Sequence, residues 1–139
     1  MTSRVVVDTN IIFSALLHRR SRQREMLALA TAKFHSPRFT FVELFKHKER
    51  IKAKSDLTED ELLEALNAVI NRLVLVDESE IAIGTWMEAR RLCGGIDLKD
   101  SPFVALALHL DALLWTDDDA LRNGLVARGF DRFFSTEDK

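Results

Sequence analysis

The hydrophobic positions of this chain form short continuous runs separated by longer amphipathic stretches. RVVVD at 4–8 is a β-branched run, which is typical of a strand covered on both faces. Runs of this kind predict strands at 4–8, 33–35, 73–76, 112–115 and 132–134. Helical patterns predict helices at about 9–17, 22–32, 40–54, 59–72, 79–93, 101–110 and 118–128.

The alternation of strands and helices predicts an α/β fold. We expect a three-layer α/β/α sandwich with a mainly parallel sheet of about five strands and right-handed crossovers. Thr58 and Glu61 have the spacing of a capping box at the start of one helix, and Gly94 and Gly129 suit helix ends. Because no repeat, low-complexity tract or linker interrupts the pattern, residues 1–139 are expected to form a single domain.

Composition narrows the class of protein. The chain has 139 residues, 47% of them hydrophobic, which is enough for one sizeable core. A single cysteine, Cys93, excludes an internal disulfide framework and fits a reducing cytosol. No apolar stretch approaches the ~18 residues of a membrane span, and Asp8 and Asn10 interrupt the apolar N-terminal run. We therefore expect a soluble, cytoplasmic protein without a membrane partner.

Charge is distributed unevenly although the net charge is only -2. Residues 18–54 carry 11 Lys/Arg against 3 Asp/Glu, and the rest of the chain carries 9 against 19. A basic segment on an acidic body indicates a polyanionic partner, although a solvated charged helix explains the charge equally well.

Acidic residues occur where strands end and helices begin. Asp8 ends the first strand, and Asp117–Asp119 follow the fourth. In open α/β sheets, ligands bind beyond the carboxyl ends of the strands. If strands one and four are neighbours, these acids meet in one crevice. Glu43 and Asp100 add two more acids near helix starts.

Each of these acids also has a purely structural explanation. Thr40 and Glu43 have capping-box spacing, Asp100 can cap the helix at 101–110, and Asp8 can cap the helix after the first strand. The triple aspartate can combine a cap with first-turn acids favoured by the helix dipole. These explanations do not account for four acidic clusters at such positions in one small domain. Oxygen ligands without a His/Cys set favour Mg²⁺ or Mn²⁺ over structural zinc.

Three segments, in order along the chain, resemble the PIN-domain nucleases. The segments are RVVVDTNIIFSALL, FTFVELFKHK and IDLKDSPFVALALHLDALLWTDDDAL, and the resemblance covers nearly the whole sequence. Among the members of the family, the chain is most similar to small stand-alone bacterial and archaeal proteins, many of which are toxins of toxin–antitoxin modules.

The resemblance implies particular residues. The family's metal-binding acids match Asp8, Glu43, Asp100 and Asp118. Its supporting positions match Asn10, Asp97, Thr116 and Asp117. In the fourth element the family shows Thr, one variable residue and then Asp, which selects Thr116 and Asp118; the acidic neighbours Asp117 and Asp119 leave that choice open.

The implied activity is metal-dependent hydrolysis of RNA by a site that holds one or two Mg²⁺ or Mn²⁺ ions. RNA contacts are expected at Arg20, Arg22, Arg24, Lys46 and Arg50, since phosphate contacts give affinity with little base specificity. The family also implies a small antitoxin and a homodimer as partners.

Two other functions compete with this reading. A non-catalytic RNA- or protein-binding module that keeps the fold is disfavoured because all four acidic positions are filled. A phosphatase of the haloacid-dehalogenase type needs Asp-x-Asp, and Asn10 occupies the second place.

Overall fold

A four-stranded parallel sheet forms the centre of the protein, whose computed structural model describes residues 3–94 and 98–135. The strand order is β3-β2-β1-β4, and all three pairings are parallel. The chain crosses from β3 at one edge to β4 on the far side of β1. The strands are β1 Arg4–Val7, β2 Lys33–Pro37, β3 Leu73–Val76 and β4 Leu113–Trp115.

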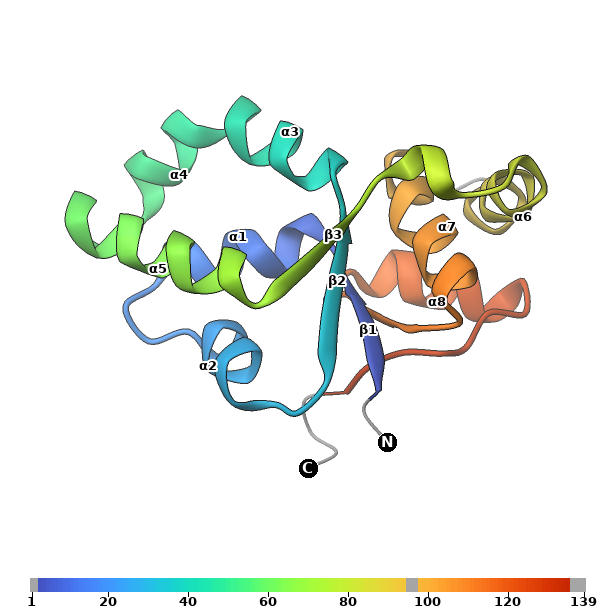
Figure 1. Cartoon of the computed structure of the whole chain (residues 1–139), viewed down its shortest axis with the longest axis horizontal. Helices are drawn as coiled ribbons and strands as arrows, with labels where there is room; N and C mark the ends of the chain where they lie inside the picture. Colours follow the sequence, from blue (N-terminus) through green and yellow to red (C-terminus); the bar gives the residue numbers. More distant parts are fainter. Residues whose placement is uncertain (1–2, 95–97, 136–139) are drawn as a thin grey trace.

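Helices cover both faces of this sheet, as the hydrophobic pattern predicted (Figure 1). Alternate valines of β1 serve the two layers: Val5 and Val7 pack with α1, α2 and α5, whereas Val6 packs with α6, α7 and α8. The helices are α1 Thr9–Leu17, α2 Arg22–Leu29, α3 Phe39–Lys46, α4 Lys48–Lys54, α5 Glu59–Asn71, α6 Ile83–Cys93, α7 Ser101–Leu110 and α8 Asp119–Ala127, with 3₁₀ turns η1 Glu78–Glu80 and η2 Leu98–Asp100. The three-layer α/β/α sandwich is confirmed.

The prediction of a fifth strand at 132–134 is wrong in extent. Residues 132–134 form a single parallel bridge, Leu114 to Phe133, instead of a strand. Leu114 N–H donates to the Arg132 carbonyl, and Phe134 N–H donates to the Leu114 carbonyl, both at 2.9 Å. Because β4 is only three residues long before the chain turns at Thr116, it offers this segment little edge to pair with.

Two expected helices are divided. The helix expected at 40–54 breaks at His47, whose backbone leaves the helical region at φ -106° and ψ 16°. The helix expected at 79–93 begins only at Ile83, because Ile81 is extended and buried in the core. The Thr58–Glu61 capping box of α5 and the Gly94 cap of α6 are confirmed.

Topology brings the first and fourth strands together. Val5, Val6 and Val7 pair with Leu113, Leu114 and Trp115, and Asp8 N–H continues the ladder to the Trp115 carbonyl at 3.2 Å. The carboxyl ends of β1 and β4 are therefore neighbours, which places Asp8 beside the Thr116–Asp118 segment.

Candidate metal centre

Asp8 is a buried carboxylate at the carboxyl end of β1. It is 4% exposed, and one carboxylate oxygen accepts a hydrogen bond from Ile11 N–H at 3.0 Å, so Asp8 is also the N-cap of α1. Burial raises its pKa to about 6; hydrogen bonds from Thr116 and Ile11 oppose this shift, and the charges of Asp117 and Asp118 add to it. Asp8 is therefore an N-cap of α1 and, at the same time, a candidate metal ligand.

Thr116 connects the two strand ends. Its side chain is fully buried and hydrogen-bonds the Asp8 carboxylate. The same hydroxyl accepts from Asp118 N–H at 3.1 Å, which fixes the turn that leads into α8. Arg122, on the first turns of α8, donates to the Thr116 carbonyl at 3.2 Å. The hydroxyl therefore joins Asp8 to the acidic turn.

The three consecutive aspartates have different environments. Asp118 is half-buried and caps α8 by accepting from Leu121 N–H at 3.1 Å. Asp117 is exposed, and its Oδ2 accepts from Gln23 Nε2 at 3.2 Å. Asp119 is exposed in the first turn of α8. The charges of Asp117 and Asp118 both raise the pKa of Asp8, so these two acids act on it electrostatically.

Glu43 does not have the capping role that its spacing suggested. The helix begins at Phe39 instead of after Thr40, and Thr40 is buried with its hydroxyl 2.6 Å from Ser36 Oγ. Thr40 therefore lies inside the helix, whose N-cap position is Arg38, and cannot serve as its N-cap. Glu43 is half-buried, and its carboxylate has no hydrogen-bond or ion-pair partner in the part of the chain that the structure describes.

Asp100 occupies the N-cap position of α7 without making a side-chain capping bond. It is half-buried at the end of η2, and α7 packs against β1. Asn10 is exposed in the first turn of α1. Asp97, expected as an accessory acid, lies outside the described residues.

The donor set suits a hard divalent cation, since it consists of carboxylate oxygens. A cation beside Asp8 would offset the repulsion that Asp117 and Asp118 exert on it. Within residues 3–94 and 98–135, however, no three His, Cys, Asp or Glu side chains form a group already able to hold a metal ion. Mg²⁺ is usually bound by only one or two carboxylates and keeps several waters, so a preformed group of three is not needed for it to bind.

The expected RNA-binding cations separate into two kinds. Arg20, Arg22, Lys46 and Arg50 are exposed. Arg24 instead directs its guanidinium at the C-terminal carbonyls of α1, donating to Ala15, to His18 at 3.1 Å and to Arg19 at 2.7 Å. Arg24 thus serves as a structural cap. Gln23 and Arg122, which contact the acidic turn, have no sequence motif that marks them.

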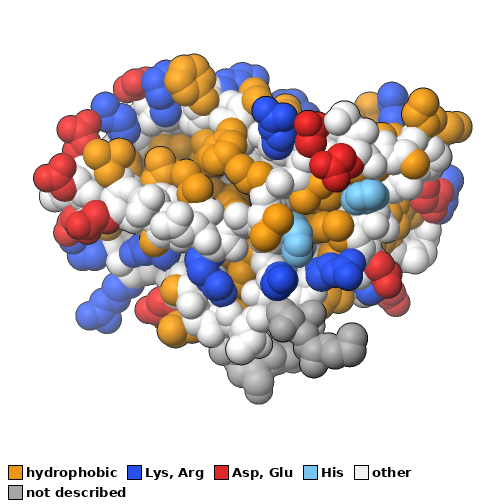
Figure 2. All heavy atoms as spheres, in the orientation of Figure 1, with side chains coloured by type: hydrophobic (Ala, Val, Ile, Leu, Met, Phe, Trp, Pro, Cys, Tyr) orange, Lys and Arg blue, Asp and Glu red, His pale blue; other side chains and the backbone are white. Residues whose placement is uncertain are grey.

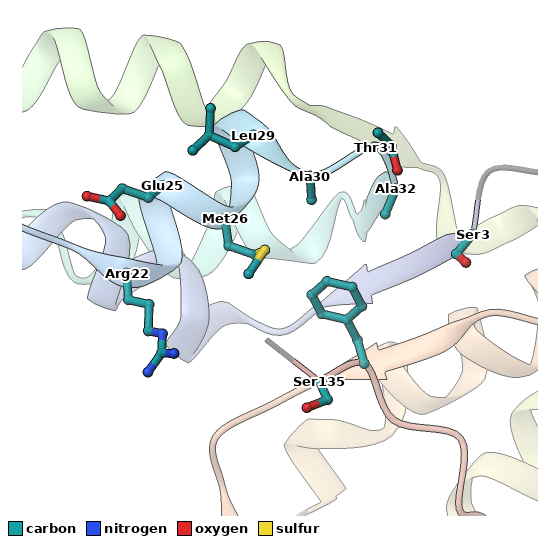
Figure 3. A pocket seen from close by; sticks show the side chains of 10 residues that line it. Ser3, Arg22, Glu25, Met26, Leu29, Ala30, Thr31, Ala32 and Ser135 are labelled. Carbon is teal, nitrogen blue, oxygen red and sulfur yellow. The ribbon is translucent and has the colours of Figure 1, made fainter. Parts of the chain in front are cut away.

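One cavity lies away from the acids. It has a volume of about 480 Å³ and is formed by α2, the start of β2 and Phe134 (Figure 3). Among the residues that the structure describes, Arg22 and Glu25 are the charged residues that line it, and Asp8, Glu43, Asp100 and Asp118 do not. The candidate site is therefore a feature of the strand ends and is separate from this hollow.

None of the helices in the described parts of the chain has the length and apolar character needed to span a membrane. The fold and the site together define a doubly wound α/β domain with carboxylates at the point where the strand order reverses. Residues 6–134 match the family model described as PIN domain, and the chain belongs to the PIN-domain family, whose members are generally nucleases.

Solved structures agree on the fold. A chain in the crystal structure of VapBC2 from Rickettsia felis bound to a DNA fragment from their promoter superposes with a TM-score of 0.60. That match covers 86% of this chain and 92% of the other, at 17% sequence identity. A search of curated proteins finds no match.

Proposed function

We propose that this protein is a Mg²⁺- or Mn²⁺-dependent ribonuclease that hydrolyses RNA phosphodiester bonds. The observation that supports this most is the buried Asp8 carboxylate, joined through the Thr116 hydroxyl to the acidic turn of the neighbouring strand. Burial of a carboxylate costs free energy unless a compensating charge is present, so such an acid in a nuclease family points to cation binding.

The proposed cation ligands are Asp8, Glu43, Asp100 and Asp118, with Asp117 as a further acid at the rim. A bound divalent cation supplies positive charge that activates water and stabilises the phosphoryl transition state. In this proposal Thr116 orients Asp8, and Asn10 and Asp97 support it. Exposed Arg20, Arg22, Lys46 and Arg50 hold the phosphates on either side of the cleaved bond.

We further propose that the protein is a cytoplasmic toxin neutralised by a small antitoxin, and that it forms a homodimer. The fold shared with a chain of the DNA-bound VapBC2 complex supports the antitoxin. Expression of the chain alone and together with the product of an adjacent small gene tests this: growth arrest that the second gene relieves is expected, and normal growth with the chain alone contradicts a toxin role.

Cleavage of labelled RNA by purified protein tests the nuclease itself. Activity is expected with Mg²⁺ or Mn²⁺, and it should disappear with EDTA, in Asp8→Asn and in Glu43→Gln. Glu49→Gln, which removes an exposed acid from α4, is the matched control and should remain active. Cleavage that survives EDTA or both site substitutions refutes the mechanism. RNA binding without cleavage under every metal condition supports the alternative, a non-catalytic module that keeps the PIN fold.

A further inference from the structure

A side chain of α2 reaches the acidic turn that follows β4. Gln23 Nε2 donates to Asp117 Oδ2 at 3.2 Å, and 94 residues separate the two in sequence. Two further hydrogen bonds of this turn are local: Asp118 N–H donates to the Thr116 hydroxyl, and Arg122 of α8 donates to the Thr116 carbonyl. Gln23 therefore ties the turn to a different helix, on the other side of the chain reversal.

The amide of Gln23 is held at both ends. Its Oε1 accepts from the Ser21 hydroxyl at 3.3 Å, a hydrogen that is shared with the Ser14 carbonyl at 3.2 Å. Ser21 is 4% exposed and is the N-cap of α2. Because one end of a primary amide accepts and the other donates, the contact with Ser21 directs the NH₂ group of Gln23 toward Asp117. The side chain is therefore an oriented donor, in contrast to a free surface amide.

The carboxylate that Gln23 holds acts on the buried acid of β1. The pKa of Asp8 is raised mainly by burial, and the charge of Asp117 raises it further. The interaction of two charges falls with the distance between them, so the effect of Asp117 at Asp8 depends on where its side chain lies. A cation beside Asp8 is attracted by the same charge. A group that fixes Asp117 therefore adjusts the attraction for that cation.

We propose that Gln23 is a positioning residue of the metal centre: it holds the Asp117 carboxylate, and with it the acidic turn, beside Asp8, and so raises the affinity for a divalent cation. This inference rests on the proposed function for the presence of that cation. The donor is uncharged, although Lys and Arg are frequent on the surface, as Figure 2 shows over α4 and α5. A cationic donor would compensate Asp117 and repel the bound ion, whereas an amide orients the carboxylate and leaves its charge available.

A competing role for Gln23 is attachment of α2 to the body of the domain. That attachment has stronger sources: Met26 and Leu27 are buried in the core, and the guanidinium of Arg24 donates to carbonyls at the end of α1. A single amide hydrogen bond at the surface adds little to these contacts. The position of Gln23 is therefore better explained by what it does to Asp117 than by what it does to α2.

Binding of Mn²⁺ to the metal-free full-length chain, followed by the EPR signal of free Mn²⁺, tests the inference without cleavage. Gln23→Met keeps the length of the side chain but removes the amide, and should weaken Mn²⁺ binding roughly tenfold, as loss of the groups that orient metal ligands does. Asn123→Met removes an exposed amide from α8 and is the matched control, which should bind as the natural chain does. In the Asp117→Ala background, Gln23→Met should have no further effect.

Mn²⁺ affinity that stays within about twofold in Gln23→Met overturns the inference. So does a roughly tenfold loss that is equally large in the Asp117→Ala background, because Gln23 then acts independently of Asp117. A loss of stability to urea in EDTA with unchanged Mn²⁺ affinity assigns Gln23 to the attachment of α2 instead. Mn²⁺ binding that is absent, or that survives Asp8→Asn, refutes the metal centre and the inference together. Mn²⁺ binding that needs Asp8 and Gln23 in a protein that never cleaves RNA supports the inference and refutes the nuclease, so the two failures are distinguishable.

Discussion

The Thr116 hydroxyl hydrogen-bonds the Asp8 carboxylate between the ends of two neighbouring strands, 108 residues apart in sequence. The same oxygen accepts from Asp118 N–H. One buried hydroxyl thus fixes both the candidate ligand of β1 and the turn that carries the candidate ligand of β4. Substitution of Thr116 should therefore affect both acids.

The charge of Asp8 should destabilise the metal-free protein at neutral pH. Its pKa rises from 3.8 to about 6 on folding, so the folded state holds a proton that the unfolded state has released between these values. The free energy of unfolding should therefore fall by about 3 kcal/mol as pH rises from about 4 to about 6, and then remain lower. Urea unfolding in EDTA at pH 4 and pH 8 measures this.

Asp8→Asn should remove that pH dependence while keeping a good N-cap, since Asn caps helices as well as Asp. The substituted protein should consequently gain stability relative to the natural chain between pH 4 and pH 8. Exposed Asp119→Asn is the control, and should follow the natural chain. An equal difference between Asp8→Asn and the natural chain at both pH values contradicts the raised pKa.

Divalent cations should raise the stability of the folded chain. At a hundredfold excess over its dissociation constant, a ligand bound only to the folded state adds about 2.7 kcal/mol. Thermal unfolding with Mn²⁺ should therefore show a Tm several degrees higher than with EDTA. Asp8→Asn and Glu43→Gln should lose most of the increase, whereas Glu49→Gln should keep it. An increase of equal size in all variants indicates binding elsewhere.

Thr116→Val should disturb Asp8 without changing the shape of the core much. It removes the hydrogen bond that lowers the pKa of Asp8, so that pKa should rise further, and it leaves Asp118 N–H without its partner. A loss of about 1–3 kcal/mol is expected. Thr116→Ser, which retains the hydroxyl, should preserve both properties. Carboxyl ¹³C NMR titration of metal-free protein reads the pKa; an unchanged Asp8 titration contradicts the assigned contact.

Much of this arrangement was predictable from the sequence because it depends on local patterns. The RVVV run predicts a buried strand, Asp8 follows it directly, and the adjacency of β1 and β4 is the switch-point arrangement expected of such sheets. In contrast, the capping-box spacing of Thr40 and Glu43 was misleading because the helix already begins at Phe39, which places Thr40 inside it. The position at which the helix starts, earlier than the spacing suggested, decided between two locally allowed roles.

Individual side-chain contacts and local breaks in helices were not predictable. Gln23 reaches Asp117 across 94 residues, and no residue pattern distinguishes it from an ordinary surface glutamine. The break at His47 likewise lies within a stretch whose side chains all suit a helix. The identity of the fourth acid was ambiguous in sequence, and the structure separates the three aspartates by burial and by hydrogen-bond partner.

Each aspartate of the triple run should therefore respond differently to substitution. Asp118→Ala should cost about 1 kcal/mol of stability through the lost N-cap, and also reduce RNA cleavage. Asp117→Asn, at an exposed position, should reduce cleavage without a stability loss, and Asp119→Asn should change neither. Urea unfolding and cleavage of labelled RNA, measured on the same preparations, separate the two effects. Full activity in Asp118→Ala would transfer its proposed role to Asp117.

Arg20 and Arg24 carry the same charge, but their substitution should have different effects on stability and on RNA affinity. Arg24→Gln removes the guanidinium from the α1 carbonyls and should cost about 2 kcal/mol of stability, with a minor effect on RNA affinity. Arg20→Gln, at an exposed position, should leave stability unchanged while weakening RNA binding and lowering its dependence on salt. Anisotropy at two salt concentrations and urea unfolding test both variants. Equal losses of RNA affinity would show that Arg24 leaves its carbonyls to bind phosphate.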